Sequence, residues 1–416
     1  MKTARRVAVV ARAVFPLHGY GGLERHVYDL VRHLELAGVQ VRLITRRSSG
    51  ARVHTDAPPF GSSVDVTTIP YRTFPFAGRR GTTILDRSTA YPLFGERAGR
   101  LAWELARSGE IDIVHGLGAS VLGYARRRHK TTVPLVMNPQ GLEEFGATDP
   151  SRARAKRVAY LPLRRAVLTC ARAADCVIAT DRSLEPAVLQ HLRVPREKVR
   201  LVPNAIDLQS IDAMVRPGNV DRLRAAAGIG ADDLVLLSVG RLEANKGFDV
   251  LVEALAALQA HGGLPGNWKW VLIGDGPGRG TLERAVARAA LTPHVLMPGR
   301  LTDADLHAWY AAATLFVHPT LYEGSSLVTL EAMAHRRAIV ASRAGGLPDK
   351  VKPRQNGWLV EPGKADALGA ALSGALSQRE RLMEMGAESR RIVEREFAWP
   401  AVSRRLLDLY NELLGR

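Results

Sequence analysis

The stretch from Leu321 to Ala334 contains two glutamates, Glu323 and Glu331, separated by a Gly-Ser-Ser turn and an apolar run typical of a helix. On that helix Glu331 would share a face with Leu327. A buried ionised carboxylate is costly unless it has partners. Two adjacent hydroxyls on a ligand, such as those of a ribose, would supply a bidentate partner. A salt bridge to a nearby arginine is the structural alternative.

Two cations stand together in the segment SVGRLEANKGFDVL. Arg241 and Lys246 flank a loop that leads from an apolar strand into a helix starting at Gly247 or Phe248. A fork-shaped and a point-like cation beside a helix start would suit a diphosphate. The segment is not a P-loop, because it lacks the Gly-x-x-x-x-Gly-Lys-Ser/Thr run. Two solvated loop cations are the alternative.

A glycine-rich loop follows the first predicted strand. Gly19, Gly21 and Gly22 precede a helical pattern that starts near Leu23 or Glu24. Glycines here allow the backbone to approach a ligand and expose amides at a helix N-terminus, which favours an anion. A plain tight turn is the alternative.

Other patterns are weaker binding signals. The glycines at 274–280 lack the Gly-x-Gly-x-x-Gly spacing of a dinucleotide site, so they predict a tight strand-to-helix turn. Asp303 and Asp305 could hold a metal-bound diphosphate, but Thr302 and Asp305 have capping-box spacing. We therefore expect no metal site. Lone histidines near strand ends are more often structural, and they are His18, His115 and His318.

The elements that must position these residues alternate along the whole chain. Short apolar runs alternate with amphipathic stretches such as 248–260, a pattern that predicts parallel sheets covered by helices on both faces. The fold class is therefore α/β, with one doubly wound Rossmann-like domain in each half. The predicted strands are 6–11, 39–45, 111–116, 133–138, 176–180, 199–203, 234–240, 268–274, 294–299, 314–319 and 337–342.

The predicted domains are residues 1–207 and residues 208–395, followed by a C-terminal helix at 396–416. A polar stretch at 208–233 with a short helical pattern is predicted to be the linker. Residues 71–100 are rich in Pro, Gly and Arg and predict a mobile loop with one short helix.

Composition limits the function classes. The chain has 416 residues, 46% of them hydrophobic and 24% charged, as in soluble globular proteins. No apolar run reaches the length of a membrane span, and Arg12 interrupts the only stretch resembling a signal peptide. Cys170 and Cys176 have no metal or redox spacing, so we expect reduced core thiols in a cytoplasmic protein. Residues 1–210 hold 33 Lys and Arg against 18 Asp and Glu, so most of the net charge of +17 lies there.

Taken together, these motifs resemble those of the retaining glycosyltransferases of family four, which have the GT-B architecture. The resemblance is carried by the segments GYGGLERHV, VRLVPNAID, VGRLEANKGFDVLVEAL, IGDGPGRGTLE, PGRLTDADLHAWYAAATLFVHPTLYEGSSLVTLEAMA and AGGLPDKV. It is nearly continuous from Leu234 to Gly363 and patchy before that. It implies two Rossmann-like domains that face a cleft, with a C-terminal helix that crosses back to the first domain.

The resemblance also implies roles for the charged residues. Arg241 and Lys246 match the cations that neutralise a nucleotide diphosphate. Glu331 matches the second glutamate of a Glu-x7-Glu motif and would hold the ribose hydroxyls. Glu323 matches the first and would face the donor sugar.

Further donor contacts follow from the same resemblance. Gly21 and Gly22 match a loop near the phosphates, Arg300 and Leu301 lie where such enzymes grip the base, and His115 stands where a histidine often contacts the sugar. The start of the second-glutamate helix would add contacts from Ser325, Ser326 and Leu327. This chain has Glu-Gly-Ser-Ser where Glu-Gly-Phe-Gly is common, so its donor-sugar contacts differ from the common pattern.

The function implied is transfer of a sugar from a UDP- or GDP-sugar to a glycan or lipid-linked acceptor, with retention and without a metal or other cofactor. Synthesis of the cell envelope is the expected setting. A nucleotide-sugar epimerase or a sugar-phosphate-dependent synthase on the same fold is the alternative. A nucleic-acid-binding protein is disfavoured, because few aromatics accompany the basic clusters.

The basic first half suggests an anionic partner. The clusters lie at 126–130, 152–157 and 163–165, and the segment 151–174 could form an amphipathic interfacial helix that Pro162 would kink or divide. Such a helix would hold the protein at the inner face of an anionic membrane. A soluble enzyme with an Arg-rich surface is the alternative.

Overall fold

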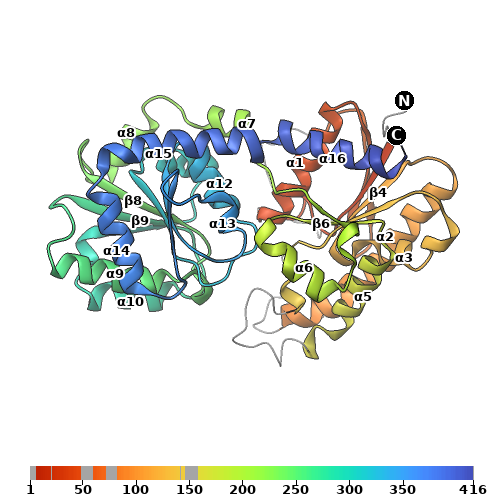
Figure 1. The fold of residues 1–416 in the computed structure, drawn as a ribbon, viewed down its shortest axis with the longest axis horizontal. Helices are drawn as coiled ribbons and strands as arrows, with labels where there is room; N and C mark the ends of the chain where they lie inside the picture. Colours follow the sequence, from red (N-terminus) through yellow and green to blue (C-terminus); the bar gives the residue numbers. More distant parts are fainter. Residues whose placement is uncertain are drawn as a thin grey trace. The chain divides into compact units, whose positions relative to one another are not determined.

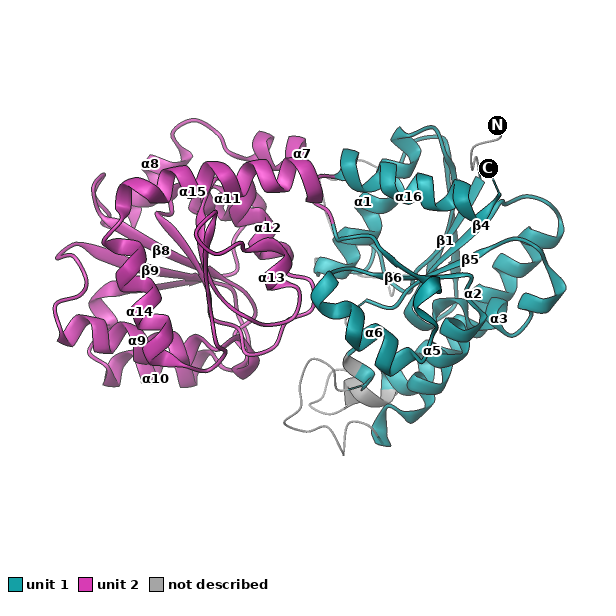
Figure 2. Ribbon diagram, viewed as in Figure 1, with its two compact units in different colours: residues 1–204, 399–416 teal, residues 205–398 magenta. Residues whose placement is uncertain are grey.

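The computed structural model describes residues 6–19, 21–47, 60–71, 82–140, 142–145 and 158–415. They form two compact units, shown in different colours in Figure 2. Unit 1 comprises Met1–Asn204 and Trp399–Arg416, and unit 2 comprises Ala205–Ala398. The predicted boundary at 207/208 lies close to this division, and the predicted C-terminal helix belongs to unit 1.

Unit 1 contains a seven-stranded sheet in the part of the chain that is described, in the order β3-β2-β1-β4-β5-β6-β7. All neighbouring strands are parallel. The strand order reverses between the neighbours β1 and β4. The loops that follow these two strands therefore lead to opposite faces of the sheet. The strands are β1 (Arg6–Val10), β2 (Gln40–Arg46), β3 (Val64–Ile69), β4 (Ile113–Leu117), β5 (Leu135–Asn138), β6 (Cys176–Ala179) and β7 (Val199–Leu201).

Helices cover both faces of this sheet (Figure 1). One face packs on α2 (Thr82–Arg107), α3 (Leu122–Ala125) and α5 (Leu161–Ala173), which contribute Phe94, Leu122 and Val167 to the core. The other face carries α1 (Gly22–Leu36) and the C-terminal helix α16 (Trp399–Leu413), which pack on each other. Another helix, α6 (Glu185–Leu192), lies beside β7.

Helix α2 differs from the predicted loop at 71–100. It continues through Pro92 because its buried face, with Phe94, Ala98 and Ala102, packs under the sheet. Its glycines also serve this packing, since a Cβ at Gly95 would collide with the carbonyl oxygen of Ala119. Tertiary contact therefore overrides the weak helix propensity of Gly and Pro.

Unit 2 contains a second parallel sheet, six-stranded in the described residues, in the order β10-β9-β8-β11-β12-β13. Here the order reverses between β8 and β11. The strands are β8 (Leu234–Val239), β9 (Trp268–Ile273), β10 (Val295–Gly299), β11 (Leu315–His318), β12 (Ala338–Ser342) and β13 (Gly357–Val360). The two sheets with their helices confirm the predicted doubly wound α/β fold.

The helices of unit 2 divide into two layers. The layer of α9 (Phe248–Ala260), α10 (Arg279–Arg288) and α14 (Ala365–Leu376) contributes Phe248, Leu282 and Leu368 to one core cluster. The opposite layer includes α11 (Asp303–Ala312), α12 (Leu327–Ala334) and α15 (Arg379–Ile392). A short helix, α13 (Leu347–Lys350), follows β12.

The predicted linker at 208–233 is wrong. Its residues form α7 (Leu208–Met214) and α8 (Asn219–Ala226), which pack on α11 inside unit 2. Asp207 caps α7 by accepting a hydrogen bond from the Ser210 amide at 3.1 Å. The sequence reasoning also missed the strands β3 and β13, of which β3 is a half-exposed edge strand with polar alternation.

Candidate functional site

In unit 2, a lysine, a glutamate and a histidine meet at the carboxyl ends of β8 and β11. Lys246 Nζ and His318 Nε2 each lie 2.8 Å from Glu323 Oε2. His318 ends β11, and Lys246 and Glu323 lie on the loops after β8 and β11. These are the two central strands where the sheet order reverses, the place where open α/β sheets bind ligands.

The loop after β8 is held against the loop after β11. The Asn245 carbonyl accepts hydrogen bonds from the Leu321 amide at 2.8 Å and the Thr320 hydroxyl at 3.1 Å. Gly247 adopts φ +64°, and a Cβ there would collide with the carbonyl oxygen of Pro319. A glycine at 247 therefore permits the close approach that brings Lys246 to Glu323.

The turn that carries Glu323 is also supported by the loop after β12. The Gly346 amide donates to the Gly324 carbonyl at 2.8 Å. Gly345 adopts φ +50°, and a Cβ on it would collide with the carbonyl oxygen of Glu323. Gly345 and Gly346 thus allow the loop after β12 to pack closely against the turn that carries Glu323.

The environment sets the charges of this cluster. Burial would raise the pKa of Glu323, but the hydrogen bond from His318 and the charge of Lys246 hold that pKa well below its usual range. Burial lowers the pKa of His318, although the bond to Glu323 opposes that effect. A neutral His318 donates from Nε2, and its buried Nδ1 has no hydrogen-bond partner among the described residues. The cluster is therefore an ion pair oriented by a neutral histidine.

A second lysine lies behind the same turn. Lys350 is fully buried at the end of α13, and its Nζ donates to Ser325 Oγ at 3.2 Å and to the Gly346 carbonyl at 3.3 Å. The ammonium also lies 5.5 Å from the ring centroid of Phe397. The hydroxyl of Ser325, a predicted donor contact, is thus oriented by a cation. Sequence reasoning missed Lys350, because a lysine after Gly-Gly-Leu-Pro-Asp resembles a solvated loop residue.

Ser326 and Leu327 form the start of α12. Ser326 is the N-cap, and its Oγ accepts from the Thr329 amide at 3.4 Å. Leu327 is the first helical residue and packs against the core. Ser326 therefore satisfies an amide of the first turn of α12, the helix that follows the turn carrying Glu323.

Glu331 lies within α12 and is only partly buried. Tyr310 of α11 donates from its hydroxyl to Glu331 Oε2 at 2.9 Å. Burial and the neighbouring carboxylate raise the pKa of Tyr310 well above its usual value, so this hydroxyl stays a donor. Tyr310 therefore orients the carboxylate of Glu331 from the neighbouring helix α11.

Arg241, Arg300 and Leu301 occupy more open positions. Arg241 follows β8, has 66% of its side chain exposed and pairs with Glu243 at 3.0 Å. Arg300 is exposed after β10, and Leu301 is half-buried against the core. These residues lie at the carboxyl edge of the sheet, and the described contacts do not bring Arg241 into the ion pair of Lys246 and Glu323.

The remaining predicted donor contacts lie in unit 1. Gly21 is the N-cap of α1 and Gly22 its first residue, close to the predicted helix start. His115, the predicted sugar contact, lies on β4 inside unit 1. It is 1% exposed, and its Nδ1 lies 2.6 Å from the Tyr410 hydroxyl of α16. Burial lowers the pKa of His115 to about 3, so its ring is neutral.

The Asp-x-Asp pattern serves helix α11. Thr302 is the N-cap and accepts from the Asp305 amide at 3.2 Å. Asp305 also forms a salt bridge with Arg222 of α8. The capping interpretation is therefore confirmed, and the carboxylate of Asp305 is engaged in packing α11 on α8.

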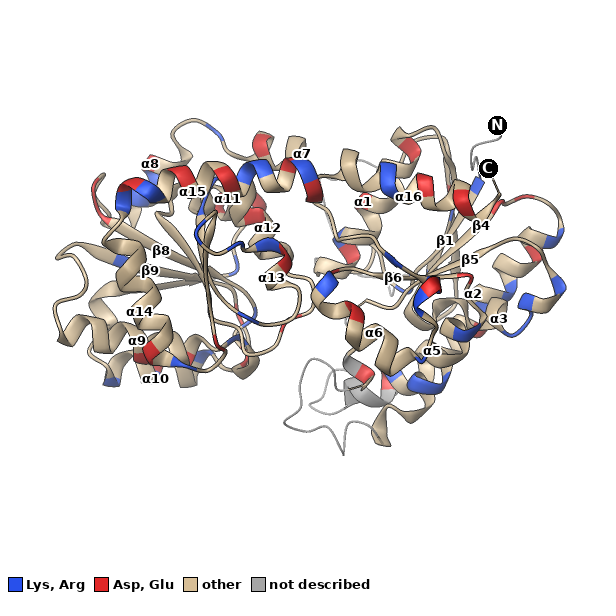
Figure 3. Cartoon of the chain, viewed as in Figure 1, with Lys and Arg blue, Asp and Glu red and all other residues tan. Residues whose placement is uncertain are grey.

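The basic clusters of unit 1 are partly neutralised, as the mixture of acidic and basic residues in Figure 3 shows. Arg126 and Arg127 pair with Glu96, and Arg128 pairs with Asp175. In the cluster at 163–165, Leu163 is buried. Pro162 lies in the first turn of α5, and a turn at Tyr160 separates this helix from helical residues 158–159, so the segment is divided here as predicted. The cluster at 152–157 lies outside the described residues.

Two further predictions concern the chain as a whole. Within the described ranges, every helix is too short or too polar to cross a membrane. Cys170 and Cys176 are free and buried, and burial raises the pKa of each thiol to about 12. Both are therefore unreactive core residues.

Comparison with known proteins agrees with this geometry. Residues 20–210 match the profile described as Glycosyltransferase Family 4, and residues 219–392 match Glycosyl transferases group 1. A D-inositol 3-phosphate glycosyltransferase of Xylanimonas cellulosilytica is 28% identical over 95% of this chain and 93% of its own.

Solved structures match over nearly the whole length. The sucrose-phosphate synthase of Thermosynechococcus elongatus has a TM-score of 0.78 and 24% identity, covering 99% of both chains. Anabaena Alr3699/HepE in complex with UDP and glucose has a TM-score of 0.70 and 18% identity, covering 98% of this chain and 99% of its own. The two profiles follow one another along the chain, and each unit has the doubly wound sheet of the GT-B fold. The chain therefore belongs to glycosyltransferase family four, with the GT-B fold.

Proposed function

We propose that this glycosyltransferase moves a sugar from a UDP- or GDP-sugar to a glycan or lipid-linked acceptor, with retention of anomeric configuration and without a metal. The observation that carries the proposal is the contact of Lys246 with Glu323 at the switch point of the unit 2 sheet. Glu331 lies on α12, the helix that follows the turn carrying Glu323. The donor class is further supported by the relative from Anabaena, whose structure contains UDP and glucose.

The proposed chemistry divides the work among these residues. The ammonium of Lys246 stabilises the negative charge that develops on the departing diphosphate, and Arg241 adds a second, more exposed cation. Such electrostatic stabilisation commonly contributes more to catalysis than any other single effect. Glu331, oriented by Tyr310, accepts the two ribose hydroxyls, and Glu323 faces the donor sugar.

Nucleotide binding and product analysis test this function. Thermal unfolding with UDP, GDP, ADP and their sugars should identify one donor, since a ligand that binds the folded state raises its apparent stability. Proton NMR of the product made with that donor should then show the donor's own anomeric configuration. An inverted product would contradict retention, and turnover of the donor without any acceptor would favour the alternative epimerase.

Transient contact with an anionic membrane belongs to the same proposal, and the excess of basic residues in 1–210 supports it. The ion pairs of Arg126, Arg127 and Arg128 reduce the charge that those residues can offer. Co-sedimentation with anionic and zwitterionic vesicles tests the contact. Binding only to anionic vesicles, lost in high salt and weakened by charge reversal at Arg154, Lys156 and Arg157, is expected. Equal, negligible sedimentation with both would contradict it.

A further inference from the structure

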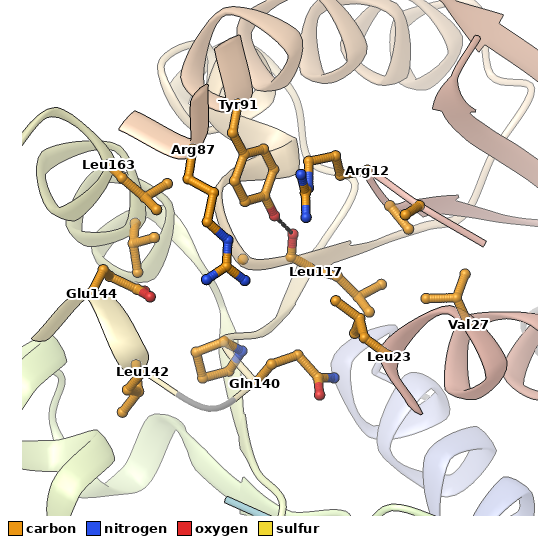
Figure 4. Close-up of a pocket in the computed structure, with 15 residues that line it drawn as sticks. Arg12, Leu23, Val27, Arg87, Tyr91, Leu117, Gln140, Leu142, Glu144 and Leu163 are labelled. Carbon is orange, nitrogen blue, oxygen red and sulfur yellow. Dashed lines mark hydrogen bonds between the residues drawn. The ribbon is translucent and has the colours of Figure 1, made fainter. Parts of the chain in front are cut away.

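Unit 1 contains a cavity of about 240 Å³ at its own topological switch point. Its walls come from the loops that follow β1, β4 and β5, together with α1, α2 and α5 (Figure 4). The loop residues Arg12, Leu117 and Gln140 mark the three strand ends. By the rule that open α/β sheets bind ligands beyond the carboxyl ends of strands, this is a binding position in its own right.

Two arginines and one glutamate give the cavity an excess of positive charge. Arg12 and Arg87 come from different elements, and Figure 4 shows their guanidinium groups directed into the same space. Among the described residues that line the cavity, Glu144 is the acidic one, and Figure 4 shows it on the side of the cavity away from Arg12. Because a guanidinium has five N–H donors, an arginine that already has one partner can still donate to a ligand.

Tyr91 fixes one of these arginines. Its hydroxyl donates to the Leu117 carbonyl at 2.8 Å, and the guanidinium of Arg12 lies 5.2 Å from the centre of its ring. Gly118 has φ +58°, and a Cβ there would lie 2.7 Å from the Tyr91 hydroxyl. The tyrosine is thus held in place, and it presents the aromatic face on which Arg12 stacks.

Gln140 adds a neutral donor. Its Nε2 is buried and has no hydrogen-bond partner within the described part of the chain. Its backbone has φ +61°, stabilised by a 3.1 Å hydrogen bond from its amide to Asn138 Oδ1, and Leu142 has φ +53°. Left-handed backbone in residues other than glycine is uncommon and concentrates at ligand sites. A buried amide without a partner is costly, and an acceptor group on a ligand would remove that cost.

The remaining walls are apolar. The side chains of α1 and α5 that line the cavity are Leu23, Val27, Leu163 and Val167. They would pack against the carbon skeleton of a ligand. The volume is below that of a site for a drug-sized molecule, so it fits one small ligand or one end group.

We propose that this cavity binds a phosphate monoester on the acceptor, with the phosphate contacted by Arg12, Arg87 and Gln140. Three donor groups from different directions match the three terminal oxygens of a phosphate monoester better than the two oxygens of a carboxylate. Calling the ligand an acceptor rests on the proposed function, whereas binding of the phosphate group does not.

Calorimetric titration of the full chain without a nucleotide tests the site. Glucose 6-phosphate and inorganic phosphate should bind at least about tenfold more tightly than glucose, the scale of a charged hydrogen bond. Arg12→Gln and Arg87→Gln should each weaken that binding about tenfold or more. Arg100→Gln is the matched control for Arg87→Gln, because Arg100 lies on α2 with Arg87. The side chain of Arg100 is 64% exposed and pairs with Glu104. Glu144→Gln should strengthen binding, because it removes the negative charge of Glu144 from the cavity wall.

Two further measurements separate the explanations. Vesicles with phosphatidic acid, compared with vesicles of equal charge made with the phosphodiester lipid phosphatidylglycerol, distinguish a lipid phosphate monoester from a soluble sugar phosphate. Specific binding of either one supports the site. The proposed phosphate site would be overturned if the Arg12, Arg87 and Arg100 variants all lost binding equally or all kept it. The absence of any binding of phosphate compounds would overturn it too. Binding of UDP that Glu331→Gln weakens reports on the nucleotide site of unit 2. Failure of UDP to bind would count against the proposed function and leave the phosphate result standing, and unchanged UDP affinity in the arginine variants shows that they are folded.

Discussion

Lys246 Nζ lies 2.8 Å from Glu323 Oε2, with only 18% and 13% of the two side chains exposed. Before any ligand binds, each of the two charges therefore offsets most of the free-energy cost of burying the other. An incoming diphosphate would share the ammonium, and Glu323 would stay ionised because His318 still donates to it. The pair thus positions a cation at the switch point without leaving a lone buried charge in the empty site.

Replacement of Lys246 separates its electrostatic and structural roles. Lys246→Met should lower turnover about 100-fold, the loss typical of removing one group that stabilises transition-state charge. It should also lower stability by about 2–3 kcal/mol, because Glu323 loses its counter-charge. Adding Glu323→Gln should restore part of the stability and none of the turnover. Lys364→Met, at an exposed lysine of unit 2, is the control for urea unfolding and kinetics. A Lys246 variant with normal turnover would exclude the proposed role.

Glu331 makes a prediction about the ribose specifically. Glu331→Gln should weaken UDP or GDP binding by about 1–3 kcal/mol, the scale of a lost charged hydrogen bond. It should leave the affinity for inorganic pyrophosphate unchanged, since pyrophosphate has no ribose. Tyr310→Phe should produce a smaller loss, because Tyr310 acts by orienting the carboxylate. Equal losses for nucleotide and pyrophosphate would show that Glu331 affects the fold of the site instead.

The contrast between Asp305 and Lys350 shows what the sequence can predict. The cap at Thr302 depends on residues three positions apart, so local spacing was sufficient to predict it. The partners of Lys350 are Ser325 and Gly346, and they converge only when the loops after β11 and β12 meet. The same holds for Tyr310 and Glu331, which come from different helices. Strands, caps and the Lys246 loop were predictable, while the groups that orient them depend on tertiary packing.

Helix α2 and His115 show the same limit in unit 1. Pro92 and the glycines of α2 suggested a loop, because nothing in the local pattern shows that a second helix packs tightly against Gly95 and Gly99. His115 resembled a ligand contact by its place at a strand end. Its partner Tyr410 lies nearly at the other end of the chain, so no local signal could reveal it.

Metal dependence gives a third prediction. Turnover should survive EDTA, because Lys246 and Arg241 already supply positive charge and Asp305 is engaged by Thr302 and Arg222. Asp303→Asn should leave turnover unchanged. Asp305→Asn should lower stability by about 1 kcal/mol through the lost salt bridge and weakened cap, with little effect on turnover. Activity that disappears with chelator and returns with Mn²⁺ or Mg²⁺ would contradict this prediction.

The contact of α16 with the sheet of unit 1 should be sensitive to acid. Trp399 stacks on His26 at 5.7 Å between ring centroids, and Tyr410 bonds His115. Burial lowers the pKa of His26 to about 4 and that of His115 to about 3, against about 6.5 in the unfolded chain. The unfolded state therefore binds more protons below pH 6.5, and stability falls as pH decreases.

Between pH 7 and pH 5 each of these histidines should cost about 2 kcal/mol, so the two together should cost about 4 kcal/mol. His26→Phe keeps an aromatic ring against Trp399 but removes one titrating group, so it should reduce the loss by about 2 kcal/mol. His129→Phe, at an exposed histidine of the same unit, should leave the loss unchanged. Urea unfolding of the three proteins at both pH values measures these differences. His26 is neutral while it is buried and takes up a proton when α16 no longer covers it. If the His26 variant and the wild type lost stability equally, protonation of His26 would not contribute to the acid-induced loss, which would contradict this prediction.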